Sequence, residues 1–179
     1  MFKKILIGLA VLFVIFVIVV ALQPSEFRIE RSILISASAA DVFPQTNDLR
    51  KLQDWSPWKK LDPNMKCTFS DPSAGVGATV SWAGNSQAGE GRETIVESRA
   101  NEYVGLRLDF IKPFESTCAT AFTLKPEGNQ TKVTWSMWGK NGFISKTFCL
   151  FMSQDKMIGE PFEEGLANLK TVVEKSAAK

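Results

Sequence analysis

The sequence predicts an α+β protein in which a curved antiparallel sheet of about seven strands is covered by one long C-terminal helix. Three observations carry this prediction. Residues 5–22 are continuously apolar, residues 27–36 and most of 66–140 alternate apolar with polar side chains, and residues 145–174 repeat apolar side chains at steps of three or four. Strict alternation is typical of a strand with one face in water. A repeat at steps of three or four residues is typical of an amphipathic helix.

The N-terminal run of 18 residues, 5–22, carries no charge and follows Lys3 and Lys4. As a helix it would be roughly 27 Å long, close to the hydrocarbon thickness of a bilayer. A cleaved signal peptide is the alternative, but its apolar region is normally shorter. We therefore expect residues 1–25 to form a single-pass transmembrane anchor.

The remaining residues, 26–179, show no repeat and no second linker, so we expect one further domain. The positive-inside tendency of Lys3 and Lys4 places that domain on the extracytoplasmic side of the membrane. Arg28 and Arg31 on the other flank make this orientation weaker than the span itself.

Composition excludes several kinds of chemistry. The chain has no histidine, which removes Ser-His and Cys-His nucleophile pairs and histidine-based zinc sites. Cys67, Cys118 and Cys149 are widely spaced without a CxxC motif and are interpreted as small packing groups. The 21 basic and 19 acidic residues are interspersed, so no nucleic-acid surface is indicated. We expect no metal and no cofactor, and the glycines of residues 75–91 match no phosphate-binding loop.

The elements follow in order. Residues 27–36 predict the first strand, and Ser38 can cap a short helix that contains Pro44. A second short helix ends near Trp55, and turn signals then divide residues 66–140 into six strands. In the C-terminal helix, Gly159 and Pro161 predict a kink or a restart.

Five segments of the chain resemble a known superfamily. They are RSILISASAADVF (31–43), WSPWKKLDP (55–63), GVGATVSWAGN (75–85), TKVTWSMWGKN (131–141) and FEEGLANLK (162–170). Over residues 27–174 the chain is similar to the SRPBCC superfamily of START-like domains, and within it to membrane-anchored bacterial proteins of the polyketide cyclase/dehydrase-like branch. The resemblance implies a helix-grip fold. It does not imply one activity, because carriers, receptors, cyclases and chaperone activators share this shell.

The space between sheet and helix is where a ligand cavity is expected. The candidate lining residues are the helix-facing side chains of the strands, one tryptophan at the rim and two residues of the helix: Trp82, Phe110, Phe122, Trp135, Met137, Trp58, Met152 and Phe162. The alternative is that these side chains fill a solid core. Gly105 and Gly159 remove side-chain volume near this seam, which is compatible with both interpretations.

Any catalysis without histidine would rest on a carboxylate, and the candidates are Asp109, Glu97, Asp155 and Glu163. Asp155 lies on the apolar stripe of the helix, where burial would raise its pKa and suit it to acid–base chemistry. An ordinary ion pair or hydrogen bond at Asp155 is the alternative.

The function expected from these features is a membrane-tethered binding or carrier domain for a hydrophobic, lipid-like or polycyclic small molecule, without catalysis. The first alternative is a polyketide cyclase/dehydrase-type enzyme that uses a carboxylate and water. The second is a protein-interaction module with a dry core. The sequence does not specify the oligomeric state.

Overall fold

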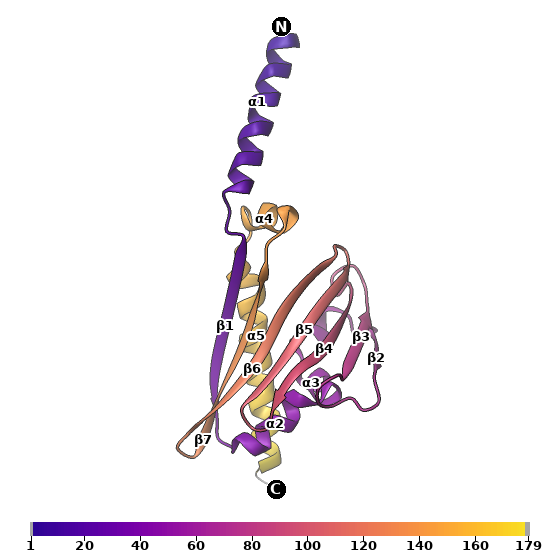
Figure 1. Cartoon of the computed structure of the whole chain (residues 1–179), viewed down its shortest axis with the longest axis vertical. Coiled ribbons are helices and arrows are strands. Elements are labelled where there is room, and N and C mark those ends of the chain that lie inside the picture. Colours follow the sequence, from indigo (N-terminus) through magenta and orange to yellow (C-terminus); the bar gives the residue numbers. More distant parts are fainter. Residues whose placement is uncertain (1, 178–179) are drawn as a thin grey trace.

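One antiparallel sheet wraps around a long helix at the C-terminus, and an apolar helix projects from one end of this assembly (Figure 1). The computed structural model describes residues 2–177. Its elements are α1 (Phe2–Ala21), β1 (Glu26–Ile35), α2 (Ala39–Asn47), α3 (Leu49–Trp55), the 3-10 helix η1 (Pro57–Leu61), β2 (Lys66–Phe69), β3 (Thr79–Ala83), β4 (Glu90–Arg99), β5 (Tyr103–Lys112), β6 (Ser116–Glu127), β7 (Gln130–Lys140), α4 (Phe143–Cys149) and α5 (Gln154–Ala177).

The seven strands lie in the order β1-β7-β6-β5-β4-β3-β2, with every neighbouring pair antiparallel. The chain thus meanders from β2 to β7, and β1 then closes against β7. The helix-facing side chains alternate with solvent-facing ones, as the sequence predicted. The α+β helix-grip fold is confirmed, with two short helices after the first strand and a long helix at the end.

The first short helix begins as predicted at Ser38, whose hydroxyl accepts a hydrogen bond from the backbone N–H of Asp41. The Asp41 carboxylate accepts in return from the Ser38 backbone N–H, which completes a capping box. Pro44 lies within α2 without ending it. This capping box fixes the point at which the chain leaves β1 and enters α2.

The long helix differs from the prediction. A break at residues 150–153 separates α4 from α5, whereas Gly159 and Pro161 both lie inside α5. Gly159 serves a packing purpose instead, because a Cβ atom there would collide with the guanidinium of Arg31. Arg31 lies between α5 and β1 and donates hydrogen bonds to Asp155 (2.9 Å) and Glu163 (2.6 Å). Glycine thus lets an arginine clamp the helix to the first strand.

The centre of the core is a cluster of aromatic rings. Trp135 of β7 stacks on Phe162 of α5 with ring centroids 4.0 Å apart. Trp55 meets Trp135 and Phe122 edge-on at 5.6 and 5.7 Å, and its Nε1 donates a hydrogen bond to the carbonyl of Gln45. These rings join the sheet, the short helices and α5 at one place.

Truncation of the stacked ring in α5 tests this cluster. Phe162→Ala should lower the free energy of unfolding by about 3–5 kcal/mol, because the ring is fully buried and its loss leaves a cavity beside Trp135. Phe148→Ala, at an exposed position of α4, is the matched control and should change it by less than about 0.5 kcal/mol. Urea unfolding of the full chain in micelles measures both, and equal effects would contradict the central role of the stack.

Candidate functional site

A cavity of about 340 Å³ separates the inner face of the sheet from the helices at the end of the domain nearest α1. Its apolar wall is formed by side chains of β1, β3, β5, β7, η1 and α5, among them Phe27, Trp58, Leu61, Trp82, Leu108, Phe110, Trp135, Met137 and Ile158. Most of its polar residues come from loops and element ends: Gln87, Ser116, Thr117, Lys140, Asn141, Ser145 and Gln154. The others are Gln53 of α3, Ser56 beside η1, Glu93 of β4 and Thr120 of β6. An apolar interior with a polar rim is typical of a site for a small hydrophobic ligand.

The structure brings five of the eight predicted residues to this cavity: Trp58, Trp82, Phe110, Trp135 and Met137. It places the other three elsewhere. Phe122 is buried between Trp55 and Trp135, and Phe162 is buried behind Trp135. Met152 lies in the break between α4 and α5 with 49% of its surface exposed. The seam is therefore solid core at the Phe122 level and hollow towards α1.

The two tryptophans of the segment DWSPW (54–58), Trp55 and Trp58, have different surroundings. Trp55 is buried in the aromatic cluster, whereas Trp58 follows Pro57 into η1 and lines the cavity. Helical spacing from Leu52 directs Trp55 inward. Pro57 ends that period, so the ring of Trp58 is free to reach the cavity.

Two glycines shape the inner and outer faces of the sheet differently. A Cβ atom on Gly91 would collide with the ring of Trp82, so this glycine allows the indole to lie across β4 as part of the cavity wall. Trp82 is held there by an Nε1–H hydrogen bond to the carbonyl of Ala88 (3.1 Å). Gly105, in contrast, lies under the side chain of Tyr103 on the outer face. Gly105 therefore adds no room to the seam, and its role is the structural one of the two interpretations left open above.

Glu93 is a carboxyl on the cavity wall that the sequence reasoning did not select. It lies on β4, opposite Val80 of β3 on one side and Leu108 of β5 on the other, and only 8% of its surface is exposed. Burial among apolar neighbours raises the pKa of Glu93 to about 7. The sequence pattern could have identified Glu93 as an inward-facing residue, because Gly91, Glu93 and Ile95 share one face of an alternating strand.

Cys118 lies in the same row of the inner face, opposite Leu108, and also lines the cavity. Burial raises the pKa of the Cys118 thiol to about 12, and the charge of Glu93 acts in the same direction. The thiol is thus protonated at physiological pH and is no nucleophile. All three cysteines are free, as the sequence predicted.

The four carboxylates selected from the sequence lie outside the cavity wall. Asp155 and Glu163 pair with Arg31, and the hydrogen bond from Arg31 lowers the pKa of Asp155. Asp155 is therefore an ordinary ion-pair partner, as in the alternative stated above, and its pKa is not raised. Asp109 accepts a hydrogen bond from Thr117, which lowers its pKa, and Glu97 pairs with Arg99.

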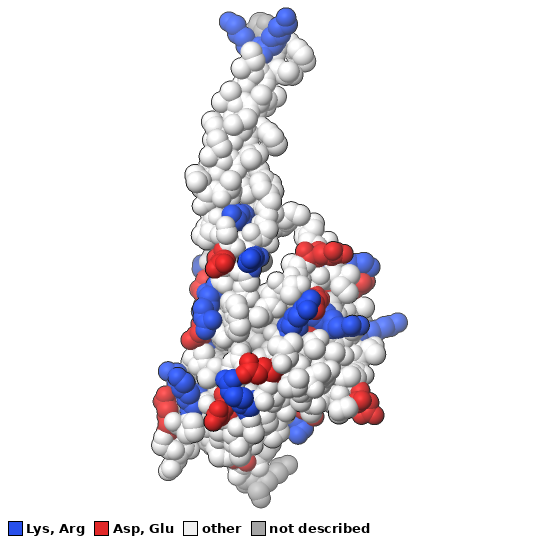
Figure 2. All heavy atoms as spheres, in the orientation of Figure 1, with Lys and Arg blue, Asp and Glu red and all other residues white. Residues whose placement is uncertain are grey.

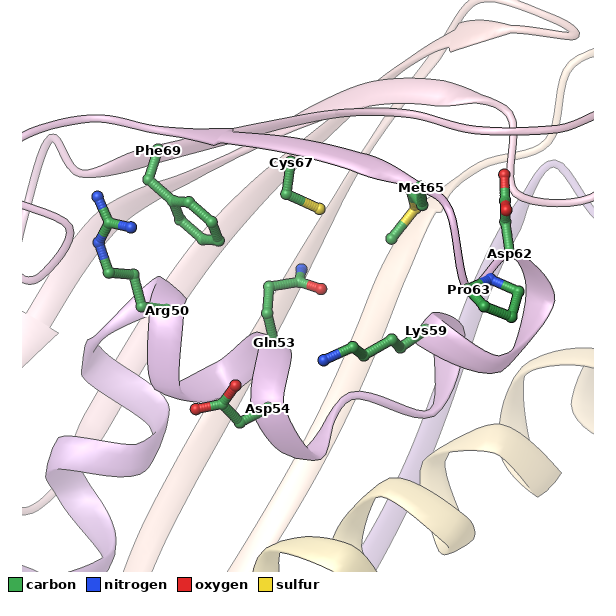
Figure 3. Close-up of a pocket in the computed structure, with 9 residues that line it drawn as sticks. All are labelled: Arg50, Gln53, Asp54, Lys59, Asp62, Pro63, Met65, Cys67 and Phe69. Carbon is green, nitrogen blue, oxygen red and sulfur yellow. The ribbon is translucent and has the colours of Figure 1, made fainter.

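A second hollow lies between α3, η1 and strand β2 (Figure 3). Figure 3 shows its lining: Arg50, Gln53, Asp54, Lys59, Asp62, Pro63, Met65, Cys67 and Phe69. Gln53 and Met65 also line the main cavity, so the two hollows adjoin. Charged side chains on this groove make it a poor site for an apolar molecule, since a ligand there would have to displace their water.

Within residues 2–177, the structure contains no cluster of three or more side chains suited to bind a metal ion. What the cavity offers is apolar area, a polar rim and one buried carboxyl. The class of protein defined by this arrangement is a helix-grip domain with an internal cavity.

Comparison with known proteins assigns the family. The model of the family described as polyketide cyclase/dehydrase and lipid transport matches residues 26–174, and this chain belongs to that family. This confirms the SRPBCC resemblance inferred from the sequence. No curated protein sequence matches the chain significantly.

Solved structures share the fold at low sequence identity. The di-domain ARO/CYC protein StfQ of the steffimycin biosynthetic pathway has a TM-score of 0.62 at 8% identity, covering 87% of this chain and 53% of StfQ. A protein from Nitrosospira multiformis has a TM-score of 0.59 at 18% identity, over 86% of this chain and all (100%) of that one. The Aha1 dimer from Colwellia psychrerythraea has a TM-score of 0.55 at 19% identity, covering 83% of this chain and 96% of that chain.

The buried carboxyl makes stability depend on pH. Because folding raises the pKa of Glu93 from 4.5 to about 7, the folded state holds its proton more tightly. The resulting stabilisation is complete below about pH 4.5 and is lost as the pH rises through about 7, by at most about 3 kcal/mol. Urea unfolding of the wild type should show this loss, whereas Glu93→Gln, which cannot ionise, should lack it. Parallel pH profiles of the two proteins would contradict the assignment.

Proposed function

We propose that this protein is a membrane-tethered binding or carrier domain for a hydrophobic small molecule, lipid-like or polycyclic. The observation that carries the proposal is the apolar cavity between sheet and helix, whose polar rim lies at the end of the domain nearest α1. Each ~100 Å² of apolar ligand surface moved into such a cavity contributes about 2.5 kcal/mol of binding free energy. The family description, which includes lipid transport, supports the same class of ligand.

Helix α1 supports the tether. It is long and apolar enough to cross a bilayer. Figure 2 shows it as an uncharged column with the blue side chains of basic residues at its free end. We assign residues 1–25 to the anchor and 26–179 to the ligand-binding domain. Lys3 and Lys4 favour the cytoplasmic side for the free end, which leaves the domain outside.

The position of α4 supports exchange of ligand with the membrane. Lys146 of α4 donates hydrogen bonds to the carbonyl of Ala21 (3.3 Å) and the hydroxyl of Ser25 (3.0 Å), at the point where α1 ends. Large apolar side chains of α4 and the following break are exposed there: Phe143, Ile144, Phe148, Phe151 and Met152. Aromatic and aliphatic side chains beside the end of a membrane span suit the bilayer interface. The rim residues Asn141 and Gln154 flank this segment, and the rim residue Ser145 lies within α4.

A cyclase/dehydrase-type enzyme is the second candidate, and Glu93 favours it. A carboxyl with a pKa of about 7 in an apolar cavity is suited to proton transfer near neutral pH. The variant Glu93→Gln distinguishes a binding role from a catalytic one, because the amide keeps hydrogen-bonding capacity but cannot transfer a proton. Loss of turnover with retained binding would identify an enzyme.

Occupancy of the cavity is tested by filling it. Native mass spectrometry of the purified full chain should detect a co-purifying apolar molecule. Met137→Trp, which adds bulk at the cavity wall, should remove most of that bound mass and leave the melting temperature nearly unchanged. Met157→Trp, at an exposed position of α5, is the matched control and should keep the ligand. Absence of ligand in the wild type, together with a Met137→Trp protein destabilised by about 1–3 kcal/mol, would show a filled core.

The anchor is tested by fractionation. The full chain should sediment with membranes and resist carbonate extraction. Lysines in place of Val14 and Ile15, at the middle of α1, should release it, because each charge at the centre of a span costs about 2.5–3.5 kcal/mol. Lysines in place of Ile144 and Phe148 of α4 should leave it membrane-bound. A mature protein that begins near Leu22 would instead identify a signal peptide.

A further inference from the structure

The cavity wall carries one acidic side chain among the residues that the structure describes, Glu93, and this side chain is buried. Its row of the inner face runs from Phe69 and Val80 through Leu108 and Cys118 to Gly139 and Phe27. The neighbours that face it within the sheet are thus aliphatic side chains and a thiol. The carboxyl therefore faces space that is otherwise apolar.

The indole N–H groups of Trp135 and Trp82 on this wall already have partners. The Nε1–H of Trp135 donates to the hydroxyl of Thr120 (2.9 Å), and that hydroxyl donates to the carbonyl of Ser136 (2.8 Å). The Nε1–H of Trp82 donates to Ala88. For Glu93, in contrast, burial is the one influence on its pKa, and within residues 2–177 no hydrogen-bond or ion-pair partner contributes. A hydrogen-bonding group that a ligand buries without giving it a partner costs about 1–3 kcal/mol, and a ligand that presents an oxygen to Glu93 avoids this cost.

The charges around the cavity favour a neutral ligand. The titratable groups on its wall are Glu93, Cys118 and Lys140, and Lys140 is the last residue of β7, at the end of the sheet nearest α1. A cationic ligand would pass Lys140, whose charge repels it, and then meet Glu93, whose raised pKa of about 7 weakens this carboxyl as a counter-ion. An anionic ligand could pair with Lys140 at the rim, but no other residue of the described wall offers it a cation, and an ionised Glu93 would repel it. An uncharged oxygen meets neither obstacle.

We propose, building on the carrier function above, that Glu93 recognises the ligand by donating a hydrogen bond from its carboxyl O–H to an uncharged oxygen. The ligand class is then a hydrophobic molecule, polycyclic or lipid-like, with a ketone, ester or hydroxyl group placed among its apolar parts. A plain hydrocarbon fits the wall but leaves Glu93 without a partner. This hydrogen bond sets which end of the molecule enters first.

Three matched probes test the inference: anthracene, its ketone anthrone, and an aminomethyl anthracene. Adducts with the full chain are measured by native mass spectrometry at about pH 6 and about pH 8, one unit on either side of the pKa of Glu93. The wild type should prefer anthrone over anthracene by roughly fivefold to tenfold at the lower pH and lose much of this preference at the higher pH. Glu93→Gln should keep the preference at both, because its amide N–H donates irrespective of pH.

Glu93→Leu is the second variant and should bind anthracene at least as well as the wild type, without preference for anthrone. An equal anthrone preference in the wild type and Glu93→Leu would overturn the proposal. So would an amine preference that disappears in Glu93→Gln, since it would show an ionised carboxylate pairing with a cation. If none of the three probes binds the folded wild type, the carrier function itself fails, and the Glu93 proposal with it.

Discussion

The stack of Trp135 on Phe162 is the contact on which the rest of the structure depends. It joins the middle of β7 to the middle of α5 and sets how closely the helix can approach the sheet. On the side away from α1 the space is filled by side chains such as Phe122 and Leu166. On the side towards α1 the same indole becomes the floor of the cavity. One ring is thus part of the core on one side and part of the cavity wall on the other.

Periodicity predicted the sheet, both short helices, the apolar N-terminal helix and the C-terminal helix, because each has one buried face or is apolar throughout. It failed at the break between α4 and α5. The sequence Leu150–Ser153 contains no glycine or proline to indicate an end, whereas Gly159 and Pro161 gave a false one. The reason for Gly159 is a contact with Arg31 of β1, remote in sequence, which no local pattern contains.

The cavity was harder to predict than the fold. Alternation identifies which residues face inward but not whether the space before them is filled, so Trp82 and Phe122 looked equivalent. Asp155 was a candidate acid–base residue because it lies on the apolar stripe of the helix. Its partner Arg31, on the inward side of the first strand, neutralises its charge. Glu93 has the same inward phase on β4 without a partner. The informative signal was a polar residue in phase with apolar ones on a strand.

The short connection between α1 and β1 limits where the domain can act. Residues 22–25 span at most about 14 Å even when fully extended, and hydrogen bonds from Asn141 to Pro24 and Ser25 shorten this reach further. With α1 in a bilayer, the domain cannot travel to a second membrane as a freely diffusing shuttle. Tethered in this way, it would move only in two dimensions along its own membrane. Delivery over a longer gap would require an acceptor to come to it.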